Sequence, residues 1–196
     1  MPKTSTRQQL LDTAAELFYR EGFRATGVDT LAAASGVGKM TLYRHFATKD
    51  DLIVAYLERS NQHFWVWFEN ATATAGGPRA QLVAFFRALE ALASQPLCYG
   101  CPFLNVAVDF PDLGHPGHQI ALAHKQAVQA RFRALAEATG HPDPALLADH
   151  LLLLMDGAFM AVRMYGVQNP ATHVSKAVEA LLGGEELSKE NQERLH

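Results

Sequence analysis

The most distinctive alternation of apolar and polar positions lies in the first quarter of the chain. Within residues 28–35, Leu31 and Ala34 share one helical face, and Gly36 then supplies the positive φ that helix ends often need. A second amphipathic segment covers residues 39–45. The pattern predicts two short helices joined by a tight turn.

The second of these helices has two opposite faces. Leu42 and Phe46 are four residues apart and point inward together, whereas Met40 and Arg44 lie almost opposite at about 100° per residue. The flanking positions carry two hydroxyl side chains, Thr41 and Tyr43. A cation, hydroxyl groups and a thioether on one outer face suit the phosphates and base edges of a DNA major groove.

Most of the remaining chain also shows helical periodicity, with glycine and proline at the breaks. Ser5 and Gln8 form the pattern of a capping box, and Thr48 can cap a later helix. The sequence therefore predicts an all-α fold of about nine helices. Besides the two helices above, we expect helices at about 5–20, 48–72, 78–93, 102–110, 118–139, 144–166 and 171–183, with the last ending at Gly183-Gly184.

The charge distribution indicates how the chain is divided. The net charge is −3 over 196 residues, but residues 1–50 carry +2 and the remainder carries −5. A basic head on an acidic body is expected where only the head approaches phosphate. Together with the helix-turn-helix pattern, the charges predict a DNA-binding domain at 1–50, a connecting helix at 48–72, a further domain at 51–184, and a charged tail at 185–196.

Composition narrows the class of protein further. The chain is 48% apolar and 19% charged, which is typical of a globular protein. Its N-terminus lacks the apolar stretch of a signal peptide, and its longest uncharged apolar run, Leu151–Met155, is too short to cross a bilayer. With only two cysteines, the sequence predicts a cytoplasmic protein without a membrane partner.

Residues 6–57 contain a series of short motifs: Leu11–Phe18, Gly22-Phe23, Ala25-Thr26, Leu31-Ala32, Gly36-Val37, Thr41–Phe46 and Lys49–Leu52. With these motifs, the segment resembles the DNA-binding domain of the TetR family of bacterial one-component transcriptional regulators. The resemblance implies a homodimer on a palindromic operator in double-stranded DNA, because one helix-turn-helix covers about half of a two-fold site.

The same resemblance implies roles for individual residues of the head. Gly27 and Gly38 depart from the family pattern, which usually has Ser or Thr at these helix N-caps, so we expect fewer phosphate contacts there. Base contacts are expected from Lys39, Met40, Tyr43 and the nearby Thr41. Phosphate contacts are expected from Thr26, Arg44, His45 and Lys49.

The last two expected helices are predicted to form the dimer interface. Residues 144–166 carry two apolar stripes, one through Leu147 and Leu151 and one through Leu146 and Leu153, and a helix with two apolar faces must bury both. The alternative is that both stripes are internal. The predicted interface consists of Leu147, His150, Leu151, Leu154, Ala158, Val174, Ala177, Val178 and Leu181.

The resemblance implies that the domain at 51–184 dimerises and binds a small-molecule effector, which the aromatic and methionine side chains in the middle of the chain could surround. The alternative is that they fill a solid core. His124 and Arg163 would supply polar groups for an anionic or phenolic ligand. The predicted ligand-binding residues are Phe64, Trp67, Phe68, Phe86, Leu89, Cys101, Phe103, Leu104, His124, Met155, Phe159 and Arg163.

The segment Cys98–Cys101 allows four interpretations. With His115 and His118 it approaches the spacing of a zinc finger, although Pro116 disturbs the helix that such a site needs. It is alternatively a CxxC redox pair, or Cys101 is a single sensing thiol, as in LmrA/YxaF-type members of the family that this segment resembles. The fourth interpretation is a pair of inert buried cysteines. Our prediction includes no metal and no cofactor.

The sequence holds no Gly-rich phosphate loop, metalloprotease motif, nucleophile elbow or paired carboxylates, so an enzyme is not expected. A Cys101–His124 nucleophile pair and a purely structural DNA-binding protein are the remaining alternatives. We predict a ligand-responsive, operator-binding regulator, most simply a repressor released by a small apolar or aromatic effector or by an electrophile. The helix at 48–72 would transmit the signal, because it runs from the DNA end to the aromatic cluster.

Overall fold

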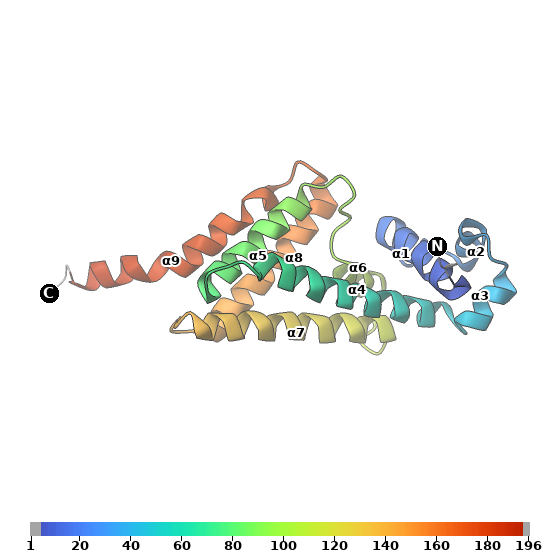
Figure 1. The fold of residues 1–196 in the computed structure, drawn as a ribbon, viewed down its shortest axis with the longest axis horizontal. Coiled ribbons are helices and arrows are strands. Elements are labelled where there is room, and N and C mark those ends of the chain that lie inside the picture. The colour runs from blue at the N-terminus through green and yellow to red at the C-terminus, as the bar shows by residue number, and fades with distance from the viewer. Residues whose placement is uncertain (1–4, 194–196) are drawn as a thin grey trace. The chain divides into compact units, whose positions relative to one another are not determined.

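The computed structural model describes residues 5–193, with side chains for residues 5–183. Within this part of the chain there are nine α-helices, one 3-10 helix and no strand, which confirms the predicted all-α fold (Figure 1). The helices are α1 Thr6–Glu21, α2 Val28–Ser35, α3 Lys39–His45, α4 Lys49–Thr72, α5 Pro78–Ala93, α6 Pro102–Asp109, α7 Pro116–Ala138, α8 Pro144–Tyr165, η1 Pro170–His173 and α9 Val174–Glu193.

The predicted helix ends are formed by the expected side chains. The Ser5 hydroxyl accepts a hydrogen bond from the Gln8 backbone N–H at 3.2 Å. A reciprocal capping box forms at the start of α4, where the Thr48 hydroxyl accepts from the Asp51 N–H at 3.0 Å and the Asp51 carboxylate accepts from the Thr48 N–H at 2.8 Å. Gly36 follows α2 in the left-handed region, with φ 66°.

The end of α9 differs from the prediction. The helix does not stop at Gly183-Gly184 but continues to Glu193, so most of the predicted charged tail is helical, while residues 194–196 lie outside the described residues. Glycine within a helix costs only about 1 kcal/mol relative to alanine, and strong helix formers follow the glycine pair. Two glycines are therefore insufficient to end this helix.

The chain folds into two compact units, which divide it elsewhere than at residue 50. The N-terminal unit contains the residues up to Phe64 together with Cys101–His124, and the C-terminal unit contains Trp65–Gly100 and the residues from Lys125 onward. The N-terminal unit thus includes α6, because the Asp109 carboxylate accepts hydrogen bonds from the loop between α1 and α2. The functional division at residue 50 remains a prediction.

The N-terminal unit is built around the aromatic residues of α1, the following loop and α4. Phe18, Phe23 and Tyr56 are buried, with ring centroids 5.1 to 5.9 Å apart. Burial of Tyr56 raises the pKa of its phenol to about 12. Leu42 and Phe46 of the helix-turn-helix are buried as well, as their spacing predicted.

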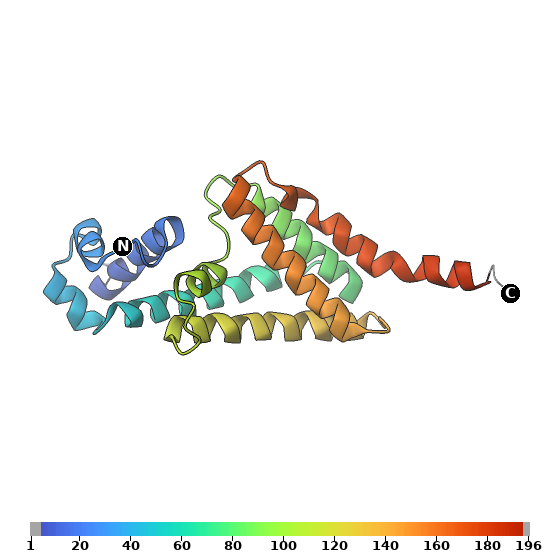
Figure 2. The same cartoon turned by 180° about the vertical axis from the view of Figure 1, so that it is seen from behind.

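The C-terminal unit has a second aromatic core. Phe68, Phe85, Phe86 and Phe132 are fully buried, and the centroids of their contacting rings are 4.8 to 6.3 Å apart. Each ring buries a large apolar area, and edge-to-face pairs add a modest further stabilisation. Helices α5, α8 and α9 pack against one another around this core (Figure 2).

Helix α8 is the one described helix that is long and apolar enough to cross a membrane by length and composition. The uncharged run Leu151–Met155, on which the prediction rested, is too short to cross a bilayer, but the apolar character extends along most of the helix. Core helices of soluble proteins pass the same test, and seven residues of α8 are buried in this fold. The helix is thus weak support for a membrane segment.

Candidate DNA-binding interface

Helix α3 presents the two faces that the sequence predicted. Leu42 is fully buried on the inner face, whereas Met40 on the outer face is 83% exposed and Tyr43 is 45% exposed. Arg44 is exposed, and Thr41 is partly exposed beside it. The outer face therefore offers a cation, two hydroxyl groups and a flexible thioether to an approaching surface.

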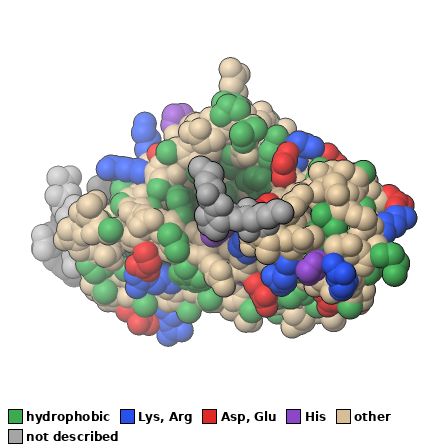
Figure 3. Space-filling view, turned by 45° about the vertical axis from the view of Figure 1, so that its right-hand side comes forward, with side chains coloured by type: hydrophobic (Ala, Val, Ile, Leu, Met, Phe, Trp, Pro, Cys, Tyr) green, Lys and Arg blue, Asp and Glu red, His purple; other side chains and the backbone are tan. Residues whose placement is uncertain are grey.

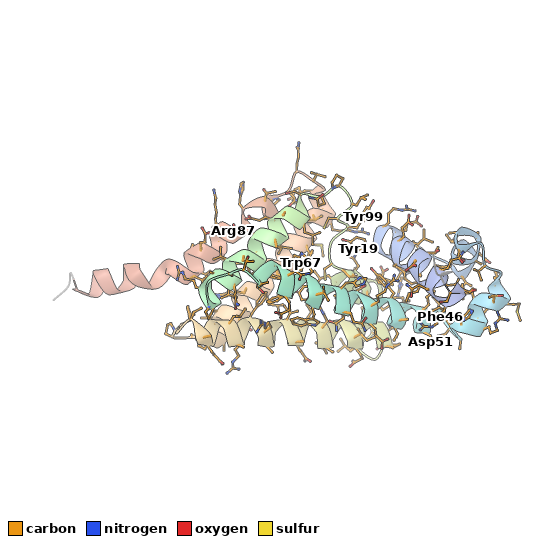
Figure 4. All side chains as sticks on the ribbon, in the orientation of Figure 1. Tyr19, Phe46, Asp51, Trp67, Arg87 and Tyr99 are labelled. Carbon is orange, nitrogen blue, oxygen red and sulfur yellow. The ribbon has the colours of Figure 1, made fainter. Side chains whose placement is uncertain are left out.

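The helix-turn-helix is held rigidly by neighbouring side chains. The Gln9 side-chain amide donates to the Ser35 carbonyl oxygen at 2.7 Å, which ties α1 to the end of α2. The Arg7 guanidinium lies over the Phe46 ring, 4.9 Å from its centroid. Phe46 follows α3 and Asp51 belongs to the first turn of α4, as labelled in Figure 4. The outer face of α3 is thus supported by a fixed scaffold.

Lys39 pairs with Asp29 of α2 rather than pointing into solvent alone. Both side chains are more than half exposed, at 55% and 77%. Exposed pairs contribute about 0–1 kcal/mol, so a phosphate can replace the carboxylate at little cost. Asp29 was not anticipated from the sequence, because nothing local places α2 residues beside the start of α3.

Two of the residues predicted to contact phosphate form hydrogen bonds within the head. Thr26 is fully buried, and its hydroxyl donates to the Gly22 carbonyl oxygen at 2.8 Å. The Lys49 ammonium donates to the Phe23 carbonyl oxygen at 2.5 Å, and desolvation by burial lowers its pKa, against the raising effect of Asp50 and Asp109. Thr26 is therefore not accessible to phosphate in this conformation, whereas Lys49 is partly exposed and its ammonium is engaged by a backbone carbonyl.

The remaining predicted contacts keep their accessibility. His45 is partly exposed at the end of α3. Gly27 and Gly38 are the N-caps of α2 and α3, and neither helix start has a side-chain cap hydrogen bond, as expected from the missing hydroxyls. On the face shown in Figure 3, basic side chains are interspersed with acidic ones rather than forming one continuous patch.

Five of the predicted effector residues belong to the N-terminal unit, where three of them meet. The buried His124 ring stacks on Phe103 with centroids 3.6 Å apart, and it forms a T-shaped pair with Phe64 with centroids 4.7 Å apart. His124 Nδ1 lies 2.7 Å from the Asn61 side-chain oxygen, so the ring Nδ1–H donates a hydrogen bond to that oxygen. Leu104 is partly exposed, and Cys101 is buried at the start of α6.

The other seven belong to the C-terminal unit and are mostly interior. Phe68, Phe86, Leu89 and Met155 are fully buried, which favours the core interpretation for these four. Phe159 is 6% exposed, and Trp67 lies 5.1 Å from the Phe85 ring. Arg163 is exposed and lines a pocket of about 220 Å³ together with Cys98 and Tyr99. A larger groove of about 980 Å³ lies between the loops 75–77 and 138–141 and is lined by none of the predicted residues.

The zinc-finger spacing does not correspond to an assembled site. Cys98 and Cys101 are buried thiols, His118 Nδ1 lies 2.9 Å from the Phe110 carbonyl oxygen, and His115 Nε2 lies 3.6 Å from an Asp50 carboxylate oxygen. Among the residues whose placement is described, no group of three or more His, Cys, Asp or Glu side chains is arranged to hold a metal ion.

Helix α8 separates its two apolar stripes. The stripe with Leu147, Leu151 and Ala158 is buried within the chain's own core, which corrects its assignment to the dimer interface. Val174 and Val178 of α9 are likewise core residues. Of the predicted interface residues, Ala177 is exposed, and His150, Leu154 and Leu181 are partly exposed. The second stripe of α8 faces outward at Leu146, Leu153, Met160 and Met164.

Helix α3 is short, is held by a packed three-helix head, and has a polar outer face opposite buried Leu42 and Phe46. These features are those of a helix-turn-helix DNA-binding protein.

Known proteins agree with this class. Residues 10–56 match the family profile described as "Bacterial regulatory proteins, tetR family", and residues 78–178 match "Tetracyclin repressor-like, C-terminal domain". The chain is similar to a TetR-family transcriptional regulator from Streptomyces coelicolor of known crystal structure, with 34% identity, a TM-score of 0.82, and coverage of 90% of this chain and 94% of that one.

Two curated relatives are also similar over most of this chain. The transcriptional activator FasR of Mycolicibacterium smegmatis is 29% identical over 71% of this chain, and the alignment spans 63% of FasR. The transcriptional repressor ComR of Escherichia coli is 27% identical over 83% of this chain and 81% of its own length. The chain belongs to the TetR family and is a DNA-binding transcriptional regulator.

Proposed function

We propose that this regulator is a homodimeric repressor that binds a palindromic operator and is released by a small apolar or aromatic effector. The observation that carries the DNA-binding part is the outer face of α3, where Met40 and Tyr43 are exposed directly opposite buried Leu42. In this proposal Lys39, Met40, Thr41 and Tyr43 meet base edges, and Arg44 and His45 meet phosphates.

The dimer is proposed to form through the outward stripe of α8. Leu146, Leu153, Met160 and Met164 are spaced by seven, seven and four residues, so they share one helical face, and all are more than a third exposed. Gly157 lies on the same face, and a Cβ added there would meet nothing within 4 Å. Glycine is therefore not required at this position by the single chain, but it would let a partner helix approach closely.

The effector is proposed to act by preferring the conformation that does not bind DNA. If the effector binds one conformation about 100-fold more tightly than the other, the difference is about 2.7 kcal/mol, which is enough to release the protein from many operators. An aromatic ligand is favoured by the rings of Phe64, Phe103 and His124, and a hydroxyl or carboxylate on it could exchange for the Asn61 contact. The burial of both cysteines gives less support to an electrophile as the signal.

The proposal is tested by selecting duplexes from a random library with the purified full-length chain. The selected duplex is then titrated by fluorescence anisotropy across a salt series, and the mass of the complex is measured. A two-fold symmetric duplex with two chains bound and a strong salt dependence supports the proposal. Selection of no duplex, or binding of a single chain without symmetry, contradicts it.

Repression is separated from activation by transcription in vitro from a promoter that carries the selected duplex. A repressor lowers the yield of transcript as the protein is added, and compounds that release the duplex in the anisotropy assay restore it. A rise in transcript with added protein would identify an activator, like FasR, instead of a repressor, like ComR.

A further inference from the structure

One residue of the loop between α1 and α2, Phe23, forms backbone hydrogen bonds with side chains from two other helices. The Phe23 backbone N–H donates to the carboxylate of Asp109, the last residue of α6, at 2.7 Å. The carbonyl oxygen of Phe23 accepts from the Lys49 ammonium at 2.5 Å, at the start of α4. The Arg24 N–H also donates to the same Asp109 oxygen at 3.2 Å. We refer to Phe23, Lys49 and Asp109 as the Phe23 clamp.

These contacts are of the strong kind. Each has one charged partner, and charge-assisted hydrogen bonds are about twice as strong as neutral ones. The Phe23 ring is fully buried against Phe18 and Tyr56, so the peptide cannot turn away from its two partners without disturbing the core of the unit. The loop is therefore fixed both by its side chain and by its backbone.

The position of Asp109 in the last turn of α6 does not stabilise that helix. A carboxylate in the last turn of a helix meets the negative end of the helix dipole. Its two backbone partners belong to the head, more than eighty residues away in sequence. Gly22 is pressed against the same carboxylate, since a Cβ added there would lie 3.3 Å from the Asp109 oxygen, and its φ is 94°. The contacts of Asp109 thus serve the head rather than α6.

The loop leads directly into the helix-turn-helix. The Thr26 hydroxyl donates to the Gly22 carbonyl oxygen at 2.8 Å and closes the loop on itself, and α2 begins two residues later at Val28. A displacement of the end of α6 would therefore be passed through Asp109 to the start of α2, and from there to α3.

We propose that Asp109 is a positioning residue that fixes the orientation of the helix-turn-helix and so sets the separation of the two recognition helices on a palindrome. This inference rests on the proposed operator-binding dimer. Loss of the Asp109 charge replaces two charge-assisted hydrogen bonds by weaker neutral ones, so each head stays folded by its own core but varies more in its orientation. Binding to one half-site needs no fixed orientation, whereas binding to two half-sites at a set spacing does.

The test compares Asp109→Asn with the matched control Asp112→Asn in the full-length protein. The Asp112 carboxylate accepts a hydrogen bond from the Gly114 N–H within its own turn, at 2.9 Å. Three duplexes are titrated by anisotropy: the selected palindrome, the same palindrome with one base pair inserted between the half-sites, and a single half-site. Thermal unfolding of each variant shows whether the protein remains folded.

For the wild type and the control, the inserted base pair should weaken binding by about 100-fold, and for Asp109→Asn by only about tenfold, a change of about 1.4 kcal/mol in spacing preference. Half-site affinity should stay within about twofold for all three proteins. The inference is overturned if Asp109→Asn keeps the wild-type spacing preference, or if it loses palindrome and half-site affinity equally. If the wild type itself selects no palindrome, the proposed function fails and the inference falls with it.

Discussion

Replacing Leu153 by glutamate should separate the proposed dimer while leaving each chain folded. Leu153 is 69% exposed in the single chain and lies in the outward stripe of α8. Full burial of a leucine contributes about 1.5–3 kcal/mol, so burying the exposed part contributes about 1–2 kcal/mol. A two-fold interface contains the residue twice, which gives about 2–4 kcal/mol and raises the dimer Kd about 30- to 1,000-fold. The need to desolvate the new carboxylate weakens the dimer further.

The assay is sedimentation velocity across a dilution series, with circular dichroism to follow unfolding. Leu122→Glu is the matched control, because Leu122 is 44% exposed on α7 and belongs to the N-terminal unit. The expected result is a monomer for Leu153→Glu at concentrations where the control and the wild type are dimers, with similar unfolding temperatures. A Leu153→Glu protein that dimerises with the wild-type Kd would refute the assignment of the α8 stripe.

Three further outcomes are expected. Arg44→Ala should reduce the slope of log affinity against log salt by about 1.8, because each of two chains then neutralises one phosphate fewer; an unchanged slope in the anisotropy titration would remove Arg44 from the interface. The pKa of a tyrosine is near 10 in the unfolded chain, and that of Tyr56 in the folded protein is about 12. The free energy of unfolding should therefore fall by about 3 kcal/mol as the pH rises from about 10 to about 12. In urea titrations, Tyr56→Phe should show a smaller fall than the wild type. Cys98 and Cys101 should react slowly with Ellman's reagent in the native protein and quickly in urea, since both are buried. A rapid reaction in the native protein would instead support the hypothesis that Cys101 is a sensing thiol.

The local features of the head could be predicted because they depend on short-range periodicity and capping. The bounds of α2 and α3 coincide with the predicted 28–35 and 39–45. The burial of Leu42 opposite exposed Met40 follows from the 3.6-residue period alone. Such signals act within one or two helical turns, so a single sequence suffices to read them.

Contacts between residues that are distant in the sequence could not be predicted. Lys49 is polar and close to the DNA-binding helices, but its ammonium donates to the carbonyl oxygen of Phe23, 26 residues away. Thr26 contacts Gly22 only four residues away, but the side-chain pattern does not indicate that its hydroxyl donates to a backbone carbonyl. Asp109 carries no sequence signal, because its partners are the backbone N–H groups of Phe23 and Arg24. Backbone groups are the same at every residue, so no pattern of side chains could identify this contact.

The two stripes of α8 show a related limit. Periodicity indicates that the helix has two apolar faces, but both faces look alike in the sequence. The structure places Leu151 in the chain's own core, contrary to its predicted place in the dimer interface, and leaves Leu153 outward. Only the packing against α5 and α9 distinguishes the two faces.

The central claim is most directly tested by the affinity of Tyr43→Ala for the selected palindrome. Tyr43 is 45% exposed on α3, so its removal should leave the unfolding temperature unchanged. Removing one base-reading side chain from each half-site costs about 1 kcal/mol or more per half-site, so we expect at least about 30-fold weaker binding, with Leu113→Ala as a control exposed elsewhere. Equal affinities of Tyr43→Ala and the wild type would contradict the assignment of α3 as the DNA-reading helix.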